Sequence, residues 1–342
     1  MFNTLKKTSL ALLVASTAFI SLSCNKDDPE ADKMGNWYRA GIPSFGGSAR
    51  SRAVSFVIGN KGYIGTGLTN ETVQRVKDFW SYDATTKIWS QVAPFEGSGR
   101  NDAVAFVVSG KAYVGLGFDG VTTVDGGYKK DFYQYDPTAN KWTKKADFAG
   151  GTRQYATAFV TADKGYVGLG WNGSGYYQDF YEYNAQTDKW TERATFTGGK
   201  RRGALAFTVG GKAYVGFGQT NSGSGTETKD LYSFDPAGNS GTGAWTRMEA
   251  NTNDDFEPRS NALSLVINDK AYIVGGNARS DTWEYTPGTN TWTEVAEFEG
   301  GQRAFAAGFA IGNTGYLGTG GSIVDDFWAF DPAVAKNDDD NL

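Results

Sequence analysis

The sequence predicts an all-β fold made of six copies of one unit, and three observations carry this prediction. A short apolar run with a central tyrosine ends in glycines six times, as in residues 111–117, which marks a strand followed by a turn with unusual backbone angles. An arginine stands thirteen residues before each of these tyrosines. A tryptophan recurs near the end of five units. Units of about 50 residues with four strands each are typical of a β-propeller, a closed ring of blades.

The first strand of each unit follows its arginine. After Arg100, for example, the small residues Ala103 and Ala105 are followed by the large Phe106. Such alternation predicts a strand with one small face and one bulky face, both buried at a crowded axis. The six arginines are Arg50, Arg100, Arg153, Arg201, Arg259 and Arg303.

The third strand of each unit begins with an aspartate and aromatic residues, as in Asp131, Phe132 and Tyr133. We expect these aspartates to cap backbone N–H groups. The fourth strand is marked by its tryptophan, and the last unit lacks one. Trp37, near the start of the chain, supplies the missing strand. The sequence therefore predicts a six-bladed propeller over residues 36–332, closed by the strand around Trp37, with no open sheet edge.

The first 23 residues have the features of a secretory signal peptide. Lys6 and Lys7 precede an apolar stretch over residues 10–22, and small residues precede Cys24. This pattern resembles the lipobox of bacterial lipoproteins, of the Bacteroidetes type, in which the cysteine becomes lipidated. The alternative is simple cleavage that leaves a free thiol. The resemblance implies a lipid-anchored protein of the cell envelope at the outer membrane, facing either the periplasm or the cell surface. Residues 24–35 then form a flexible tether, and residues 333–342 an acidic disordered tail.

Composition excludes several classes of function. The chain has no histidine, which removes Ser-His-Asp catalysis, imidazole metal sites and a histidine general base. Its single cysteine cannot form an internal disulfide. The formal net charge of −5 argues against nucleic-acid binding, which requires neutralisation of phosphates. We expect no metal, no cofactor and a monomeric propeller.

The glycine-ended second strand, the Tyr135-Asp136-Pro137 turn, the outer tryptophans and the blade-opening arginines resemble the kelch family. The resemblance covers about Trp37 to Pro332, although only Gly275 and Gly276 form the adjacent glycine pair of that family. It implies a propeller fold that serves galactose-oxidase-like domains, sialic-acid mutarotases and binding modules. A copper galactose oxidase needs histidines and a Tyr-Cys crosslink, which this chain lacks.

A candidate ligand site lies where the loops are long. The loops between second and third strands, over residues 68–77, 118–130, 171–178 and 219–229, all emerge on one face of a propeller. The six arginines enter from the same face. They either hold a carboxylate, a sulfate or an acidic peptide, or they pair with groups of the scaffold.

Two further groups of residues on this face are candidates for ligand contacts. Loop aromatics either stack on sugar rings or pin the glycine-rich loops; they are Phe118, Tyr128, Trp171, Tyr176 and Tyr177. The residues beside the arginines differ between blades, and repeats that share a scaffold are expected to differ where they bind a ligand. In our alignment of the six repeats, these residues are Arg52, Asp102, Tyr155, Arg202, Asn261 and Phe305.

These observations favour a non-catalytic binding lipoprotein that recognises a carbohydrate or protein partner through its loop face. The alternative is a sugar isomerase of the sialate-mutarotase kind, with Asp102 or Glu257 as the acid or base. A third hypothesis is a structural subunit of an outer-membrane assembly.

Overall fold

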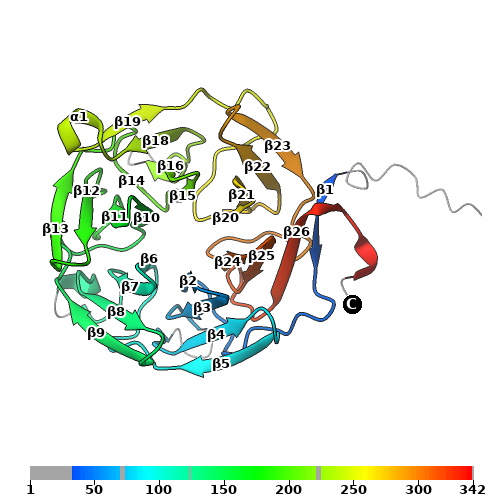
Figure 1. The fold of residues 1–342 in the computed structure, drawn as a ribbon, viewed down its shortest axis with the longest axis horizontal. Helices are drawn as coiled ribbons and strands as arrows, with labels where there is room; N and C mark the ends of the chain where they lie inside the picture. The colour runs from blue at the N-terminus through cyan, green and yellow to red at the C-terminus, as the bar shows by residue number, and fades with distance from the viewer. Residues whose placement is uncertain (1–32, 70–73, 123–124, 221–224, 341–342) are drawn as a thin grey trace, which may run out of the picture.

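The computed structural model describes residues 33–69, 74–122, 125–220 and 225–340. The predicted signal peptide and Cys24 lie outside the described residues. The described residues form six four-stranded sheets. These sheets are arranged around a central axis (Figure 1), which confirms the six-bladed propeller. Among the described residues, no helix has the length and apolar character needed to cross a membrane.

Each blade is an antiparallel meander whose first strand lies innermost. Blade one contains β2 (Val54–Ile58), β3 (Lys61–Gly65), β4 (Phe79–Asp83) and β5 (Ile88–Val92). Blade two contains β6 (Val104–Val108), β7 (Lys111–Gly115), β8 (Phe132–Asp136) and β9 (Lys141–Lys145). Blade three contains β10 (Thr157–Thr161), β11 (Lys164–Gly168), β12 (Phe180–Asn184) and β13 (Lys189–Arg193). Blade four contains β15 (Leu205–Val209), β16 (Lys212–Gly216), β18 (Leu231–Asp235) and β19 (Ala244–Arg247). Blade five contains β20 (Leu263–Ile267), β21 (Lys270–Val274), β22 (Thr282–Thr286) and β23 (Thr291–Val295).

Blade six is completed by the N-terminal strand, as the tryptophan count predicts. Its strands are β24 (Ala307–Ile311), β25 (Thr314–Gly318), β26 (Phe327–Ala335) and β1 (Met34–Tyr38). Trp37 pairs with Phe330 across β1 and β26 and is fully buried. The ring therefore closes with strands from both ends of the chain.

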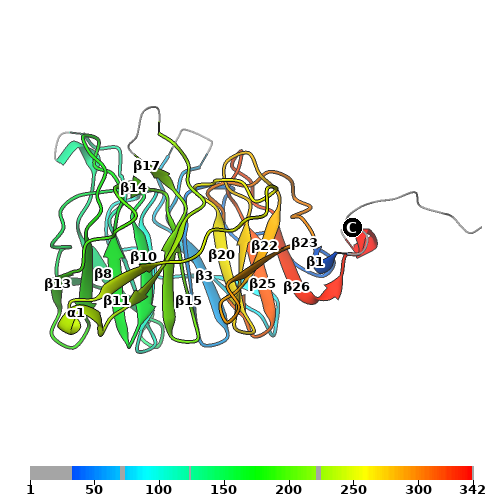
Figure 2. The same cartoon turned by 90° about the horizontal axis from the view of Figure 1, so that it is seen from above.

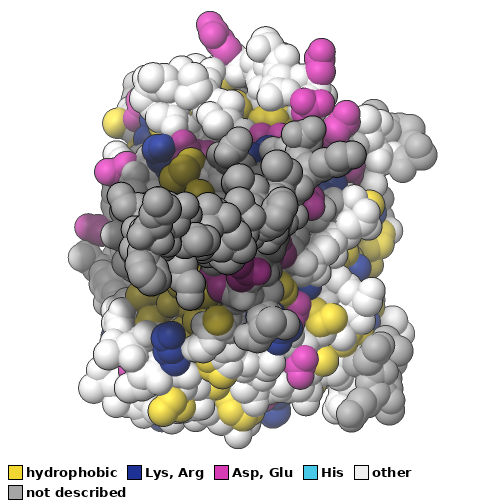
Figure 3. All heavy atoms as spheres, turned by 90° about the vertical axis from the view of Figure 1, so that its right-hand side faces the viewer, with side chains coloured by type: hydrophobic (Ala, Val, Ile, Leu, Met, Phe, Trp, Pro, Cys, Tyr) yellow, Lys and Arg dark blue, Asp and Glu magenta, His cyan; other side chains and the backbone are white. Residues whose placement is uncertain are grey.

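The C-terminal tail differs from the prediction. It is not disordered over residues 333–340, because β26 continues to Ala335 and a 3-10 turn, η2 (Asp338–Asp340), follows. The side chain of Asn36 donates to Asp340 at 2.8 Å and accepts from the backbone N–H of Asn337 at 2.8 Å. These bonds to β1 hold the acidic end against the first strand. Seen from the side that carries β1 and β26, acidic, basic and apolar side chains are interspersed on the uncovered surface (Figure 3).

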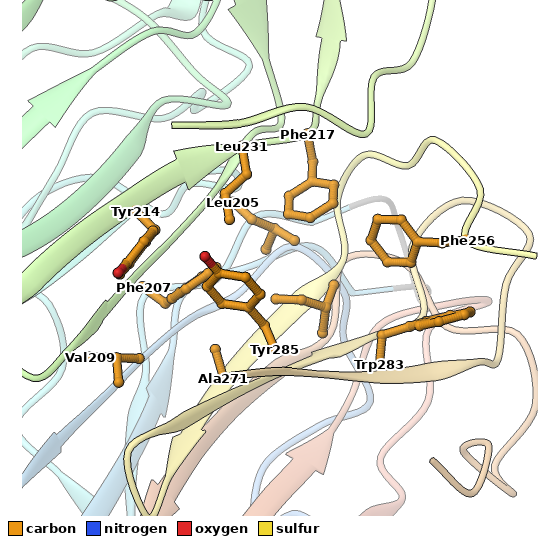
Figure 4. Packing of buried hydrophobic residues seen from close by; sticks show 11 residues of the cluster. Leu205, Phe207, Val209, Tyr214, Phe217, Leu231, Phe256, Ala271, Trp283 and Tyr285 are labelled. Carbon is orange, nitrogen blue, oxygen red and sulfur yellow. The ribbon is translucent and has the colours of Figure 1, made fainter. Parts of the chain in front are cut away.

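The core lies between neighbouring blades. Between blades four and five, Phe207 and Leu205 of β15 pack against Tyr285 of β22, and Phe256 meets Trp283 edge-on at 4.9 Å (Figure 4). Five similar clusters fill the other interfaces of the described propeller. Burial of these large aromatic surfaces supplies the main stabilisation of the ring.

The glycines that end the second strands have a steric cause. A Cβ atom on Gly115 would lie 2.4 Å from the ring of Phe132 on the next strand. Gly117 has φ of +92°, which side chains rarely adopt. In blade five the facing residue is the smaller Thr282, so Val274 replaces the first glycine. Thr282 accounts for the loss of the first glycine, and Gly275 completes the adjacent pair at the position of Leu116 in blade two; a Cβ atom on Gly275 would lie 2.4 Å from the carbonyl oxygen of Arg303.

The connections between second and third strands lie on one face, which we call the loop face (Figure 2). On this face the short strands β14 (Arg201–Arg202) and β17 (Gln219–Thr220) pair, and the 3-10 turn η1 (Asp125–Gly127) lies in the loop of blade two. The short helix α1 (Gly238–Gly241) occupies the lengthened turn between the third and fourth strands of blade four, on the opposite face. The loop face therefore gathers the variable segments.

Candidate functional site

The six blade-opening arginines are buried inside the scaffold. Their exposed fractions range from 0 to 5%, and each guanidinium binds both carboxylate oxygens of the aspartate that precedes the third strand of its own blade. Arg100, for example, donates to Asp131 at 2.6 and 2.9 Å and to the carbonyl of Leu116 at 3.0 Å. The pairs are Arg50–Asp78, Arg100–Asp131, Arg153–Asp179, Arg201–Asp230, Arg259–Asp281 and Arg303–Asp326.

This arrangement favours the second alternative for the arginines, pairing with the scaffold, and corrects the role expected of the aspartates. The arginines do not present their guanidinium groups to a ligand at the channel mouth, because paired carboxylates and carbonyls occupy them. The aspartates do not serve chiefly as backbone caps, because they neutralise the arginines. A phenylalanine ring also packs on each guanidinium, at 4.8 Å in the pair of Arg100 and Phe95. Bidentate pairing and burial together make these arginines structural.

A closed ring of backbone hydrogen bonds surrounds the axis just beyond the arginines. The residue two positions after each arginine donates its N–H to the carbonyl of its counterpart in the neighbouring blade, with N···O distances of 2.9–3.3 Å. All six residues have φ between +54° and +59°. The donor and acceptor pairs are Arg52 to Phe305, Asp102 to Arg52, Tyr155 to Asp102, Gly203 to Tyr155, Asn261 to Gly203 and Phe305 to Asn261. The ring fixes the side chains of these residues around the mouth of the channel.

Blade four differs from the sequence alignment at this position. The ring residue is Gly203, with φ of +59°, and not Arg202. Arg202 lies one position earlier, in β14, where it pairs with Gln219. Comparison of the repeats placed Arg202 at this position because Arg202 carries a charged side chain, whereas Gly203 has no side chain to compare.

The channel mouth is small. A cavity of about 140 Å³ is lined by the ring residues and by the alanines that follow them. Below it, a further cavity of about 250 Å³ is lined by Ser55, Ala105, Ala158, Ala206, Ser264 and their neighbours. Small-molecule sites usually enclose about 300–1,000 Å³. A sugar ring therefore has to lie above the mouth, with at most a substituent inside it.

Arg52, Asp102 and Tyr155 form a polar cluster in the mouth. The Nη1 atom of Arg52 lies 3.2 Å from both oxygens of Asp102 and donates to the hydroxyl of Tyr155. The guanidinium of Arg52 lies 3.6 Å from the ring centre of Phe305. Burial raises the pKa of the Asp102 carboxyl to about 6, even though Arg52 and Asn101 act to lower it. Burial and the nearby Asp102 also raise the pKa of Tyr155 to about 12.

The loops build a small cross-strand trio above the mouth in each of the first four blades. In blade three, Gln154 pairs with Trp171, which pairs with Tyr176. The corresponding trios are Ser51, Leu68 and Arg75 in blade one, Asn101, Phe118 and Tyr128 in blade two, and Arg202, Gln219 and Glu227 in blade four. Because paired residues of antiparallel strands point to the same side, each trio presents its side chains together.

These trios contact one another from blade to blade. Arg75 lies 4.7 Å from the ring centre of Phe118, and Tyr128 meets Trp171 edge-on at 5.6 Å. The rings of Trp171 and Tyr176 lie 5.2 and 5.3 Å from the guanidinium of Arg202. We call this arc the loop wall; it consists of Arg75, Phe118, Tyr128, Trp171, Tyr176 and Arg202.

Of the two hypotheses for the loop aromatics, the structure supports loop pinning for Phe118 and Tyr128, and sugar stacking stays a prediction. Phe118 covers Gly127, where a Cβ atom would lie 2.7 Å from its ring, and Tyr128 covers Gly173 in the same way at 2.9 Å. These two rings pin glycine-rich loops. Trp171 and Tyr176 lie beside the guanidinium of Arg202 and, like Phe118 and Tyr128, are partly exposed. Tyr177 lies over the structural Arg153 at 3.8 Å and lines a separate groove.

Arg202 is set apart from the other candidates beside the arginines by its surroundings. Its Nε atom donates to Gln219 at 2.9 Å, and neither terminal nitrogen has a hydrogen-bond partner among the described residues. The sequence carries one usable signal. The residues directly after the other five arginines are the uncharged Ser51, Asn101, Gln154, Ser260 and Ala304. Only blade four places a cation at this position.

Glu257, the other residue considered as an acid or base, lies away from the mouth. Glu257 is 53% exposed and lies 3.9 Å from Arg279, and it does not line the mouth. Among the described residues, no three acidic or cysteine side chains come together as metal ligands.

Comparison with known proteins agrees with the fold. The model of the Kelch motif matches residues 258–299, which span blade five and its adjacent glycines. No curated protein matches the sequence. The solved structure of YjhT, a kelch-type protein, is similar with a TM-score of 0.68 and 17% sequence identity, over 84% of this chain and 95% of that one. At this identity the likeness extends to the fold alone. The kelch resemblance is thus confirmed as a motif in blade five and as a six-bladed propeller fold.

Proposed function

We propose that the protein is a non-catalytic binding module that recognises a carbohydrate through its loop face. The observation that carries this proposal is the position of Arg202, a partly exposed guanidinium between aromatic rings with its terminal nitrogens unengaged among the described residues. Guanidinium groups bind carboxylates, sulfates and hydroxyls through paired N–H donors, and aromatic faces stack on the C–H faces of sugar rings.

Arg202 is also held in place before any ligand arrives. Gln219 fixes its Nε atom, and the rings of Tyr155, Trp171 and Tyr176 surround its guanidinium at 5.2–5.4 Å. A side chain that is already ordered loses little conformational entropy on binding. The contrast with the buried Arg201, whose charge is matched by Asp230, indicates that Arg202 serves a role other than stability.

The mouth suits one substituent of such a ligand. Arg52, Asp102 and Asn261 supply polar atoms around the cavity of about 140 Å³. A sugar ring stacked beside Trp171 and Arg202 directs a hydroxyl or carboxyl group into this space. Selectivity then comes from the mouth, and most of the contact area comes from the loop wall.

We also propose that the protein is anchored in the cell envelope through lipidated Cys24. The basic residues, apolar stretch and cysteine at the start of the sequence support this proposal. In the described structure, the chain enters the fold through β1 at the outer edge of blade six, away from the axis (Figure 1). An anchor attached at that edge leaves the loop face accessible.

Lipidation is tested by metabolic labelling of producing cells with an alkyne-tagged fatty acid. We expect label on the wild-type protein and none on Cys24→Ser, because Cys24 is the only cysteine in the chain. Equal labelling of the two proteins would contradict the anchor.

Carbohydrate binding is tested with the protein from Lys26 onward on a glycan array, followed by affinity measurements. We expect Arg202→Ala and Trp171→Ala to weaken binding by about 10- to 100-fold, the value of one charge-assisted contact or one stacked ring. Arg247→Ala, which removes an exposed arginine from β19 of the same blade, serves as the matched control and should bind normally. Absence of binding by the wild-type protein across the array would exclude a carbohydrate and favour a protein partner.

One observation favours an enzyme of the mutarotase kind as the second candidate. Asp102 is buried at the mouth with its pKa raised to about 6, so both of its protonation states are populated near neutral pH. In mutarotation the carboxylate takes a proton from the anomeric hydroxyl, and the bond from the anomeric carbon to the ring oxygen breaks as a carbonyl forms. The protonated Asp102 then returns that proton to the ring oxygen. Closure of the ring reverses these transfers. Arg52 would hold the carboxylate of an acidic sugar nearby.

The raised pKa of Asp102 predicts a specific pH dependence of stability. The carboxyl titrates near 3.8 in the unfolded chain and near 6 in the folded protein, so between these values the folded state binds more protons. Its contribution to the free energy of unfolding therefore falls as the pH rises through this window. Since one pKa unit is worth about 1.4 kcal/mol, the loss amounts to about 3 kcal/mol.

The neutral isostere Asp102→Asn should lack this contribution. We expect chemical denaturation to show that the stability of the wild type relative to Asp102→Asn falls by about 2.4 kcal/mol between pH 4 and pH 7, because the remainder of the change lies below pH 4. Parallel pH profiles for the two proteins would mean that the carboxyl titrates normally.

NMR of anomeric exchange separates the two candidate functions. A mutarotase accelerates exchange of a sialic acid between its anomers, and Asp102→Asn should abolish that acceleration by removing the proton acceptor. No acceleration by the wild-type protein would exclude this activity and leave the binding module.

A further inference from the structure

We propose that a groove in the loop of blade three is a second sugar subsite, which takes a pyranose unit of an acidic oligosaccharide. This inference rests on the proposed carbohydrate function. The groove has a volume of about 440 Å³ and is lined by residues that include Asn172, Tyr176, Tyr177, Gln178, Asp179 and Lys200. It is about three times the size of the mouth, which makes it large enough for a sugar ring.

The groove adjoins the loop wall. Tyr176 lines the groove and also lies 5.3 Å from the guanidinium of Arg202. One side chain therefore separates the proposed primary contact from the groove. A glycan of two or more units that places one ring over Arg202 reaches the groove with the next ring.

The aromatic surface of the groove is rigid. The guanidinium of Arg153 lies 3.8 Å from the ring centre of Tyr177, and Asn172 donates its amide N–H to the Tyr177 hydroxyl at 2.6 Å. The backbone N–H of Tyr177 donates to Gly170 at 3.0 Å. A ring fixed at its face, its hydroxyl and its backbone is a preorganised platform for a sugar.

Polar groups beside this platform are available to a ligand. The Gln178 amide and the Lys200 ammonium have no hydrogen-bond or ion-pair partner among the described residues, and Lys200 is exposed. The charge of Asp179 is matched by Arg153. The net charge at the groove is therefore positive, and Arg202 adds a second cation two residues from Lys200. Two uncompensated cations on adjoining sites favour uronic, sialic or sulfated units over neutral sugars.

A steric block of the groove gives a sharp test. A Cβ atom on Gly175 meets no atom within 4 Å, and the backbone there lies outside the left-handed region, so Gly175→Trp fills the groove without straining the loop. A Cβ atom on Gly288, in the turn between β22 and β23, also meets no atom within 4 Å, and the backbone there is also outside the left-handed region. Gly288→Trp therefore provides the matched control. Lys200→Ala removes the charge without adding bulk, and it carries the test if Gly175→Trp fails to fold.

The probes are uronic-acid, sialylated and sulfated glycans of one to four units, titrated against each variant of the protein from Lys26 onward. We expect the wild type and Gly288→Trp to bind glycans of two or more units about tenfold more tightly than single units. Gly175→Trp and Lys200→Ala should lose this preference for length and keep the affinity for single units. A length preference that survives in both variants, or that is missing from the wild type, would overturn the subsite and leave the proposed function intact. Failure of the wild type to bind any of these glycans, or unchanged binding by Arg202→Ala, would instead overturn the proposed function.

Discussion

The bidentate ion pair between a buried arginine and an aspartate underlies the whole architecture. Within blade two, Arg100 connects the start of the first strand to the carbonyl of Leu116 and to Asp131, which precedes the third strand. Its own carbonyl accepts the N–H of Gly67 from blade one at 2.8 Å. Arg100 thus connects three segments of blade two with the segment that follows the second strand of blade one. Loss of one partner would leave an unpaired buried charge, which typically costs about 3–5 kcal/mol.

This constraint also determines where function can reside. An aspartate and backbone carbonyls engage the terminal nitrogens of the arginine, and the backbone two residues later is fixed in a left-handed conformation by the closed hydrogen-bond ring. The side chains at these two following positions point toward the mouth and the loop wall and are free to differ between blades. Arg202 and Asp102 illustrate the two positions. A repeated scaffold thereby yields a candidate site that lies mainly on blades two to four, with no sixfold symmetry.

The sequence predicts features with a constant spacing and fails for features that depend on the length of a loop. The distance from arginine to strand tyrosine and the distribution of tryptophans suffice for six blades and for closure by Trp37. The arginine and aspartate partners are 22 to 31 residues apart, because variable loops separate them, so spacing alone cannot reveal their pairing. Gly203 was missed because it has no side chain. The ordered tail depends on Asn36, which is 301 residues away from Asn337 in sequence.

The balance of charge would allow an acidic protein to hold the acidic ligand that we propose. The chain has a formal net charge of −5, yet Lys200 and Arg202 flank Arg201, whose own charge is matched by Asp230. At physiological salt, charges more than about 8 Å apart are largely screened at exposed positions. The overall negative charge therefore contributes little at the groove, whereas the two cations act directly on a ligand in contact with them. Affinity then depends on contact at the junction of blades three and four, and long-range attraction plays a minor part.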